Sequence, residues 1–151
     1  LKLDDQGSMI DFVMNDKCAA GTGKFLEMVA RTLDIELDEL SRLSEQSLQP
    51  CDINNMCVVF AESEIISLLA KKTAPEDIIA GIYRSFSRRI GNLVKRLGMQ
   101  NEVVFVGGVA KQTGLRQSLS DHLEKTFLSL DVDPQITGAL GAAVLAQKIK
   151  T

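Results

Sequence analysis

Hydrophobic and polar residues follow two different periods along this chain, and these periods predict its elements. Near the N-terminus, short apolar runs at residues 1–5 and 9–15 flank a polar turn that contains Gly7, which predicts a β-hairpin. From Lys24 onward, apolar residues recur three and four positions apart, as they do on one face of an α-helix. Residues 38–46 predict a second, shorter amphipathic helix.

The middle of the chain predicts two longer helices. Residues 57–72 are apolar nearly all round, so we expect a buried helix there. Residues 74–98 carry the strongest helical signals, with Pro75 near the first helical position and Gly98 at the end. One continuous apolar stripe predicts the face that packs in the core: Ile78, Ile79, Ile82, Phe86, Ile90, Leu93, Val94 and Leu97.

The last third of the chain predicts strands and helices in alternation. Residues 102–108 predict a buried strand that runs into a glycine pair, and residues 127–131 predict a short second strand. A helix is expected after Gly114, and a final helix over residues 134–150 is rich in small residues that permit close packing. Because strands alternate with helices, the expected fold class is α/β. No repeat or interdomain linker divides residues 1–151.

Composition and charge are those of a folded, soluble domain. The chain of 151 residues is 45% hydrophobic and 25% charged, which is ordinary for a globular protein. A net charge of −3 with dispersed basic residues argues against a nucleic-acid partner. No apolar run approaches the roughly 20 residues that span a membrane. The polar first residues, without an initiator Met or a signal peptide, indicate a fragment of a longer chain and favour a cytoplasmic location.

Two glycine turns are candidate ligand sites. Gly107 and Gly108 end a predicted strand and precede a helix, where α/β sheets bind ligands and glycine lets the backbone approach a phosphate closely. Gly21 and Gly23 flank Thr22 before another helix and could form a nest of backbone N–H groups for an anion. Either pair could equally be a simple tight turn. Neither matches the phosphate loop of P-loop ATPases or the dinucleotide fingerprint.

The three cysteines raise the question of a metal site. Cys18 and Cys57 each lie immediately before a predicted helix, a setting that favours the thiolate form, and soft metal clusters prefer thiolate ligands. The chain has no CxxC motif, and two well-placed ligands are fewer than the four that an iron–sulfur cluster needs. A cluster would therefore have to lie on a twofold axis between two chains. The alternative is that Cys18, Cys51 and Cys57 are three buried or idle thiols.

Several other polar residues have weaker claims to a role. His122, the single histidine, is expected to face solvent. Glu62 and Glu64 lie in an otherwise apolar helix and could bind a ligand or pair with basic neighbours. Asp11 and Asp16 flank the end of a predicted strand, where an acid–base role is conceivable but a solvated carboxylate is the simpler interpretation.

Four segments in combination resemble one known family over nearly the whole chain. They are NDKCAAGTGKFLE, CVVFAESEIISLL, VVFVGGVAKQTG and TGALGAAVLA. The pattern is similar to the ATP-dependent activators of 2-hydroxyacyl-CoA dehydratases and to the related ATPase subunits of benzoyl-CoA reductases. The resemblance implies an actin-like fold, shared with sugar kinases and the Hsp70 ATPase domain in the ribonuclease H-like group, of which this chain would be the C-terminal half.

The resemblance also implies a cofactor and partners. Members of the family are homodimers that share one 4Fe–4S cluster, held by two cysteines from each chain, which by motif are Cys18 and Cys57. Cys51 matches no expected ligand. ATP binding and hydrolysis, with Mg, would drive transfer of a low-potential electron from ferredoxin or flavodoxin to an acyl-CoA dehydratase or reductase component.

The nucleotide-binding residues follow by the same carry-over. They would be Gly21, Thr22, Gly23, Gly107, Gly108, Val109 and Ala110. Lys111 and Gln112 depart from the family's usual polar pair, and no catalytic residue is assigned. Both phosphate loops of the family would precede residue 1, so the chain alone is expected to hydrolyse ATP poorly or not at all. The alternatives are a sugar-kinase-like phosphotransferase, with Asp11 or Asp16 as general base, and a cluster-free dimerisation domain.

Overall fold

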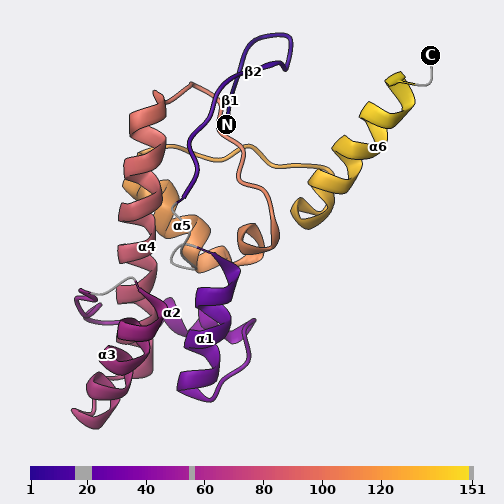
Figure 1. Ribbon diagram of the computed structural model, residues 1–151. Helices are drawn as coiled ribbons and strands as arrows, with labels where there is room; N and C mark the ends of the chain where they lie inside the picture. Colours follow the sequence, from indigo (N-terminus) through magenta and orange to yellow (C-terminus); the bar gives the residue numbers. More distant parts are fainter. Residues whose placement is uncertain (16–21, 55–56, 150–151) are drawn as a thin grey trace.

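The computed structural model describes residues 1–15, 22–54 and 57–149, which form a helical body with a projecting hairpin and a projecting final helix (Figure 1). The described residues form two short strands, six α-helices and two short 3-10 helices. In chain order the elements are β1 (Lys2–Leu3), β2 (Met9–Asp11), α1 (Gly23–Leu33), α2 (Glu39–Ser44), α3 (Val58–Ala70), α4 (Pro75–Leu97), η1 (Gly108–Lys111), α5 (Thr113–Leu123), η2 (Pro134–Ile136) and α6 (Thr137–Ile149).

The predicted N-terminal hairpin is confirmed. β1 and β2 pair antiparallel, with Lys2 opposite Asp11. The Asp4 carboxylate accepts hydrogen bonds from the backbone N–H groups of Gln6 and Ser8, which closes the turn. Gly7 has a φ of +77°, in the left-handed region that glycine adopts without strain.

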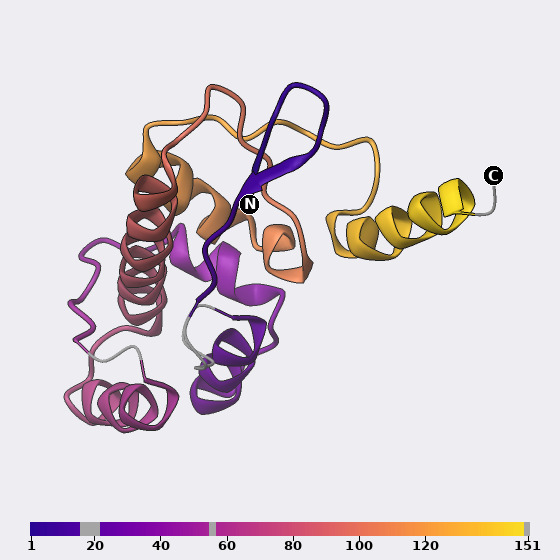
Figure 2. The ribbon, with the colours of Figure 1, turned by 45° about the horizontal axis from the view of Figure 1, so that its top comes forward.

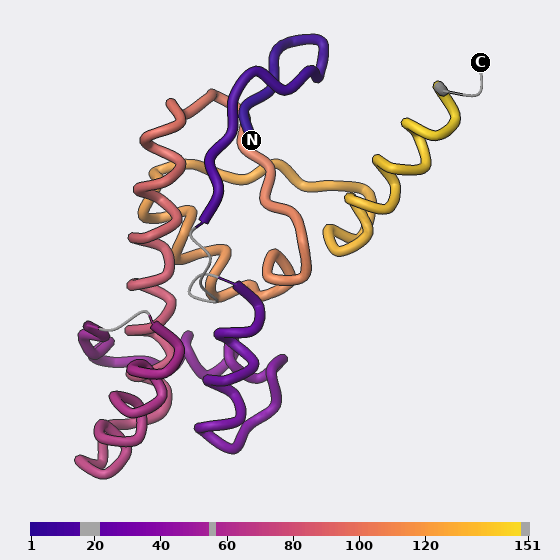
Figure 3. Tube along the Cα trace, viewed as in Figure 1, coloured from indigo at the N-terminus to yellow at the C-terminus, as the bar shows by residue number. Residues whose placement is uncertain are grey.

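Helix α4 contacts α2, α3 and α5, and α1 joins the same core through its packing against α3. Figure 3 traces α4 along the length of the body with α5 beside it. The predicted helices α1, α2 and α4 are confirmed. The predicted stripe of α4 is buried from Ile78 to Phe86, whereas its later members, from Ile90 to Leu97, are only partly buried. The largest fully buried side chains are Tyr83, Phe25, Phe86, Leu26, Leu40, Ile65, Ile78, Ile79, Ile82, Leu115, Val29 and Ser87.

The helix predicted over residues 57–72 forms as α3, but the expectation that it is buried is wrong. Ala61 and Ile65 enter the core. Val59 and Phe60 remain 68% and 62% exposed, and Ile66 is exposed as well. Val58, Leu68 and Leu69 are partly buried against the same core, so one side of the helix is attached and the side with Val59, Phe60 and Ile66 stays open within the described chain.

The two strands predicted in the last third do not form as regular strands in the described residues. Val104 makes one parallel bridge with Leu128, and the N–H of Leu128 donates to the carbonyl of Val103 at 2.9 Å. Alternate residues still point to opposite sides: Val103 and Phe105 pack beside α5, whereas Val104 and Val106 are exposed. The strand periodicity is therefore present, but a ladder needs neighbouring strands to propagate.

The last predicted helix is confirmed as α6, but its close packing is not. Figure 2 shows α6 standing away from the other helices, and residues 138–148 are all exposed. Among the described residues, no heavy atom lies within 4 Å of a Cβ built on Gly138 or Gly141. No helix in the described part of the chain combines the length and the apolar character needed to cross a lipid bilayer.

Candidate functional site

The glycine pair at residues 107 and 108 forms a sharp turn at the start of η1. Gly107 has a φ of +92°, and its N–H donates to the carbonyl of Pro134 at 2.8 Å. The N–H of Ala110 donates back to the carbonyl of Gly107 at 3.1 Å, which closes the first turn of η1. Within the described residues, the space where a Gly107 Cβ would lie is open for 4 Å. The turn thus exposes glycine backbone that a ligand can approach closely.

The turn before α1 lies against the turn of η1, although more than 80 residues separate them in the sequence. Thr22 is the N-cap of α1, and its carbonyl accepts from the N–H of Phe25 at 3.1 Å. A Cβ built on Gly23 would lie 3.6 Å from Cγ2 of Val109. The structure therefore brings Gly23 beside Val109, with Thr22 next to Gly23 in the chain, whereas Gly21 lies outside the described residues.

A third segment, which the sequence analysis missed, flanks the same turn. The side chain of Gln135 approaches Gly108, with its Nε2 atom 3.8 Å from the position of a Gly108 Cβ. Asp133 caps η2: its Oδ1 accepts from the N–H of Gln135 at 2.9 Å, and its Oδ2 pairs with Nζ of Lys111 at 3.1 Å. The N–H of Gln135 and then Lys111 lower the pKa of Asp133. An aspartate directly before Pro134 is a helix-start signal that could have revealed this segment.

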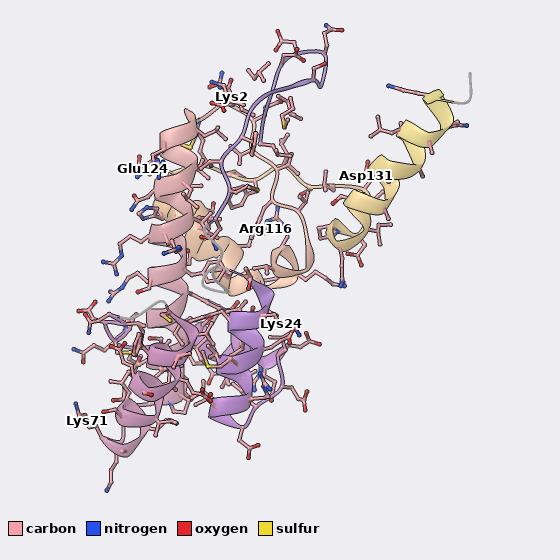
Figure 4. All side chains as sticks on the ribbon, viewed as in Figure 1. Lys2, Lys24, Lys71, Arg116, Glu124 and Asp131 are labelled. Atoms are coloured by element: carbon pink, nitrogen blue, oxygen red, sulfur yellow. The ribbon has the colours of Figure 1, made fainter. Side chains whose placement is uncertain are left out.

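Two lysine side chains with exposed ammonium groups, Lys24 and Lys111, belong to the segments that meet here. Figure 4 labels Lys24 at the start of α1, where the side chain is 77% exposed and pairs with Glu27 at 2.6 Å. Surface ion pairs of this kind contribute little stability, on the order of 0–1 kcal/mol, so they exchange partners easily. Lys24 and Lys111 can therefore leave their carboxylates for a phosphate without a large cost.

Cys57 occupies the position that the sequence predicted, at the entrance of a helix. It is the N-cap of α3, with its thiol exposed and free, and its carbonyl accepts from the N–H of Ala61 at 2.8 Å. The described residues contain no group of three or more His, Cys, Asp or Glu side chains that could hold a metal ion. One accessible thiol suits one ligand position of a cluster shared between chains. Cys18, the second predicted ligand, lies outside the described residues.

Cys51 differs from Cys57 in its surroundings. It is partly buried, with its Sγ atom 3.1 Å from the position that a Cβ on Gly81 would take. Burial, opposed by a backbone hydrogen bond, raises the pKa of the Cys51 thiol. The structure therefore presents Cys51 as a partly buried, packed thiol.

The other polar candidate residues either contact neighbouring helices and loops or lie exposed at the surface. The ring of His122 lies against Gly91 in α4, and its buried Nε2 atom has no hydrogen-bond partner among the described residues, so the expectation that it faces solvent is wrong. Glu64 accepts from the N–H and the Nδ2 of Asn54, each at 3.1 Å. Glu62 is exposed, and so is Asp11; Asp16 lies outside the described residues.

The fold as a whole matches about half of a solved dehydratase activator. It superposes with a TM-score of 0.91 on the structure of the activator of the 2-hydroxyisocaproyl-CoA dehydratase from Clostridium difficile with bound ADPNP. The two sequences are 46% identical, and the match covers 97% of this chain and 54% of that chain. The sequence profile of one family matches residues 1–146, and the chain therefore belongs to the BadF/BadG/BcrA/BcrD ATPase family.

Curated relatives agree with this assignment. The 2-hydroxyisocaproyl-CoA dehydratase activator of Clostridioides difficile is 46% identical over 146 residues, which are 97% of this chain and 54% of the relative. A benzoyl-CoA reductase subunit of Thauera aromatica is 32% identical over 149 residues, which are 95% of this chain and 53% of the relative. The resemblance to both kinds of protein is thus confirmed. The chain spans about half the length of the curated relatives it matches.

Proposed function

We propose that residues 1–151 are the C-terminal half of an actin-like ATPase that works as an electron-transfer activator. Its task would be to deliver a low-potential electron to a 2-hydroxyacyl-CoA dehydratase or benzoyl-CoA reductase component in the cytoplasm. The observation that carries the proposal is the convergence of two glycine turns, at Gly23 and at residues 107–110, in a fold whose relative binds ADPNP.

In this proposal the convergent turns bind the phosphates or the purine of ATP or ADP with Mg. Gly21, Thr22 and Gly23 would contribute one side, and residues 107–110 the other. The open space at Gly107 supports this role, because only a residue without a side chain leaves that backbone accessible. The chain would supply one wall of the nucleotide site, and we expect little or no ATP hydrolysis by it alone.

A matched pair of glycine substitutions tests the nucleotide site. Gly107→Ala and Gly7→Ala each place a Cβ at a positive φ, +92° and +77°, with open space around it among the described residues. Both therefore impose similar backbone strain, but only Gly107 lies in the proposed site. We expect Gly107→Ala to weaken ADP binding, measured by calorimetry, and Gly7→Ala to leave it unchanged. Equal effects of the two substitutions would contradict the proposed site.

The second part of the proposal is a 4Fe–4S cluster shared by two copies of the chain. Cys18 and Cys57 of each copy would hold it, since an exposed thiolate at a helix start is a suitable ligand. When bound, the cluster would supply the transferred electron, received from ferredoxin or flavodoxin. The exposed Val59 and Phe60 lie two and three positions after Cys57 and would provide apolar surface for the homodimer.

Anaerobic reconstitution with iron and sulfide tests this part. We expect about one cluster per two chains, since four thiolates are required and each chain offers two. Cys57→Ser should abolish the brown absorbance, and Cys51→Ser, at the partly buried thiol, should retain it. Iron analysis and light scattering would be read on the same samples. A colourless wild-type protein, or loss of the cluster in Cys51→Ser alone, would refute the assignment.

A further inference from the structure

We propose that Gln112 and Tyr83 are positioning residues that couple the nucleotide turn, which is the turn of residues 107–110 at η1, to the Cys57 thiol. Nucleotide at the turn of η1 would then change the accessibility of Cys57 through helix α4. The inference rests on the proposed function, since it presumes a nucleotide at that turn, but it assigns a role to residues that neither touch nucleotide nor bind metal.

The first link joins Gln112 to the nucleotide turn itself. Gln112 follows η1 directly and is its C-cap, and its N–H donates to the carbonyl of Val109 at 3.0 Å. The same residue is the N-cap of α5. The residue is only 6% exposed. Any movement of residues 108–111 must therefore displace a side chain that lies inside the protein.

The second link is a buried network that the Gln112 amide makes with three other elements. Its Oε1 accepts from the hydroxyls of Tyr83 and Ser41, each at 3.0 Å, and its Nε2 donates to the carbonyl of Leu37 at 3.2 Å. Burial raises the pKa of Tyr83 to about 12, so its hydroxyl remains a donor at neutral pH. Leaving any of these buried groups unpaired is costly, so the partners move together.

Close contacts at Gly114 hold the start of α5 against the same network. A Cβ on Gly114 would lie 2.9 Å from Cε2 of Tyr83 and 3.2 Å from Cα of Ser41. The N–H of Gly114 also donates to Oγ of Ser41 at 3.2 Å. The first turn of α5 thus contacts both α2 and α4 at Gly114, and closely packed contacts transmit such shifts.

The third link lies on the neighbouring positions of α4, which hold the loop before Cys57. Ser85 donates to the carbonyl of Ile53 at 3.0 Å, and Arg84 pairs with Asp52 at 2.6 Å. Gly81 lies so close to Cys51 that a Cβ there would overlap the Cys51 carbonyl oxygen. Residues 81, 84 and 85 thus surround position 83, so the same turn of α4 contacts both Gln112 and this loop.

The last link connects the loop to the helix that Cys57 caps. The backbone and side-chain amides of Asn54 donate to Glu64 in α3. In addition, Ala61 and Ile65 of α3 lie in the same core cluster as Ile78 of α4. Continuous contacts thus run from Gln112 through α4 and the loop at residues 51–54 to the helix that Cys57 caps.

The test measures how ADP changes the alkylation rate of Cys57 in the cluster-free full chain. Iodoacetamide labelling followed by peptide mass spectrometry resolves Cys57 from the other two cysteines, and calorimetry gives the ADP affinity of each variant. Tyr83→Phe removes one donor to Gln112 with little change in shape, and Gln112→Met removes the whole network. Ser118→Ala is the matched control, because it deletes another hydrogen bond between α4 and α5, Ser87 to Ser118 at 3.0 Å.

We expect ADP to change the wild-type rate by a factor of about five or more, the lower end of typical coupling between sites. In Tyr83→Phe and Gln112→Met this factor should fall toward one while the ADP affinity stays within about twofold, and in Ser118→Ala it should persist. Retention of the full factor in Tyr83→Phe would overturn the inference, as would a wild-type rate that ignores bound ADP; in both cases the nucleotide site stands. A wild-type chain that binds no ADP would overturn the proposed nucleotide site and the inference with it.

Discussion

Replacing Gly81 by alanine should destabilise the protein, even though alanine is the better helix former. Gly81 lies in the interior of α4 and is buried. In an exposed helix the change would stabilise by about 1 kcal/mol. Here the new Cβ would overlap the backbone carbonyl oxygen of Cys51 and lie 3.1 Å from its carbonyl carbon and from its Sγ atom.

The magnitude follows from what has to move. The obstacle is backbone, and it is held in place by the Cys51 N–H, which donates to the carbonyl of Asp77 at 3.0 Å, and by the hydrogen bond from Ser85 to Ile53. Overpacking of this kind costs about 1–3 kcal/mol, and each lost hydrogen bond adds about 0.5–1.5 kcal/mol. After the gain in helix propensity, we expect a net loss of about 1–3 kcal/mol in the free energy of unfolding.

Gly91→Ala is a matched control in the same helix. It brings the same propensity gain, but its Cβ would overlap the imidazole of His122, a side chain that can rotate away. We therefore expect a smaller loss, and in the double variant with His122→Ala the overlap disappears and the propensity gain should offset part of the lost packing. Urea titrations followed by circular dichroism measure all three variants. If Gly81→Ala proved as stable as the wild type, or no less stable than Gly91→Ala, the close approach of the loop to α4 would be refuted.

Three further predictions concern single side chains. Hydrogen bonds from Ser47 and two backbone N–H groups lower the pKa of Asp77, so the Asp77 carboxylate stabilises the folded protein above the unfolded pKa of about 3.9. Asp77→Asn should therefore be less stable than the wild type at neutral pH, and this difference should vanish as the pH falls through the lower folded pKa. Urea midpoints from pH 7 to 2 measure the difference, and a constant value would contradict the prediction. Iodoacetamide should label Cys57 faster than Cys51 at pH 7.5, because the Cys57 thiol is exposed and burial raises the pKa of the Cys51 thiol. Labelling of Cys51 should accelerate at higher pH. Equal labelling rates of the two cysteines in peptide mapping would contradict the exposure of Cys57 and the burial of Cys51. Phe60→Asp should change the free energy of unfolding by no more than about 0.5 kcal/mol, because the Phe60 side chain is 62% exposed. The same change should lower the mass measured by light scattering from that of the proposed homodimer toward that of one chain. An unchanged dimer mass would exclude Phe60 from the dimer contact.

The sequence predicted the helices well because their signals are local. The ends of α4 follow from Pro75 and Gly98, and the hairpin follows from Gly7 between two apolar runs. The contacts that build the candidate site are not local: Gly23 meets Val109 across more than 80 residues, and no periodicity encodes that pairing. The motifs identified the glycine turns one by one, but only the fold brings two of them together.

Burial was harder to predict than helicity, and the reason is physical. An all-round apolar pattern states that a surface needs cover, but it does not say which chain provides it. In α3 the described chain covers Ala61 and Ile65 and leaves Phe60 open, and the same holds for Val104 and Val106 beside their single bridge. The sequence thus indicates that these apolar side chains need to be covered, but it does not indicate which part of which chain covers them.

These two exposed apolar surfaces call for different cover. The open face of α3 begins at Cys57, so under the proposed function a second copy of the chain would cover it when the thiols meet. Val104 and Val106 alternate with the packed Val103 and Phe105, as in a strand that has one buried side and lacks neighbours. A helix surface suits a symmetric dimer contact, whereas an incomplete strand is completed by further strands of the same sheet. Under the proposed function the other half of the ATPase would cover the second surface, and Phe60→Asp should affect only the first.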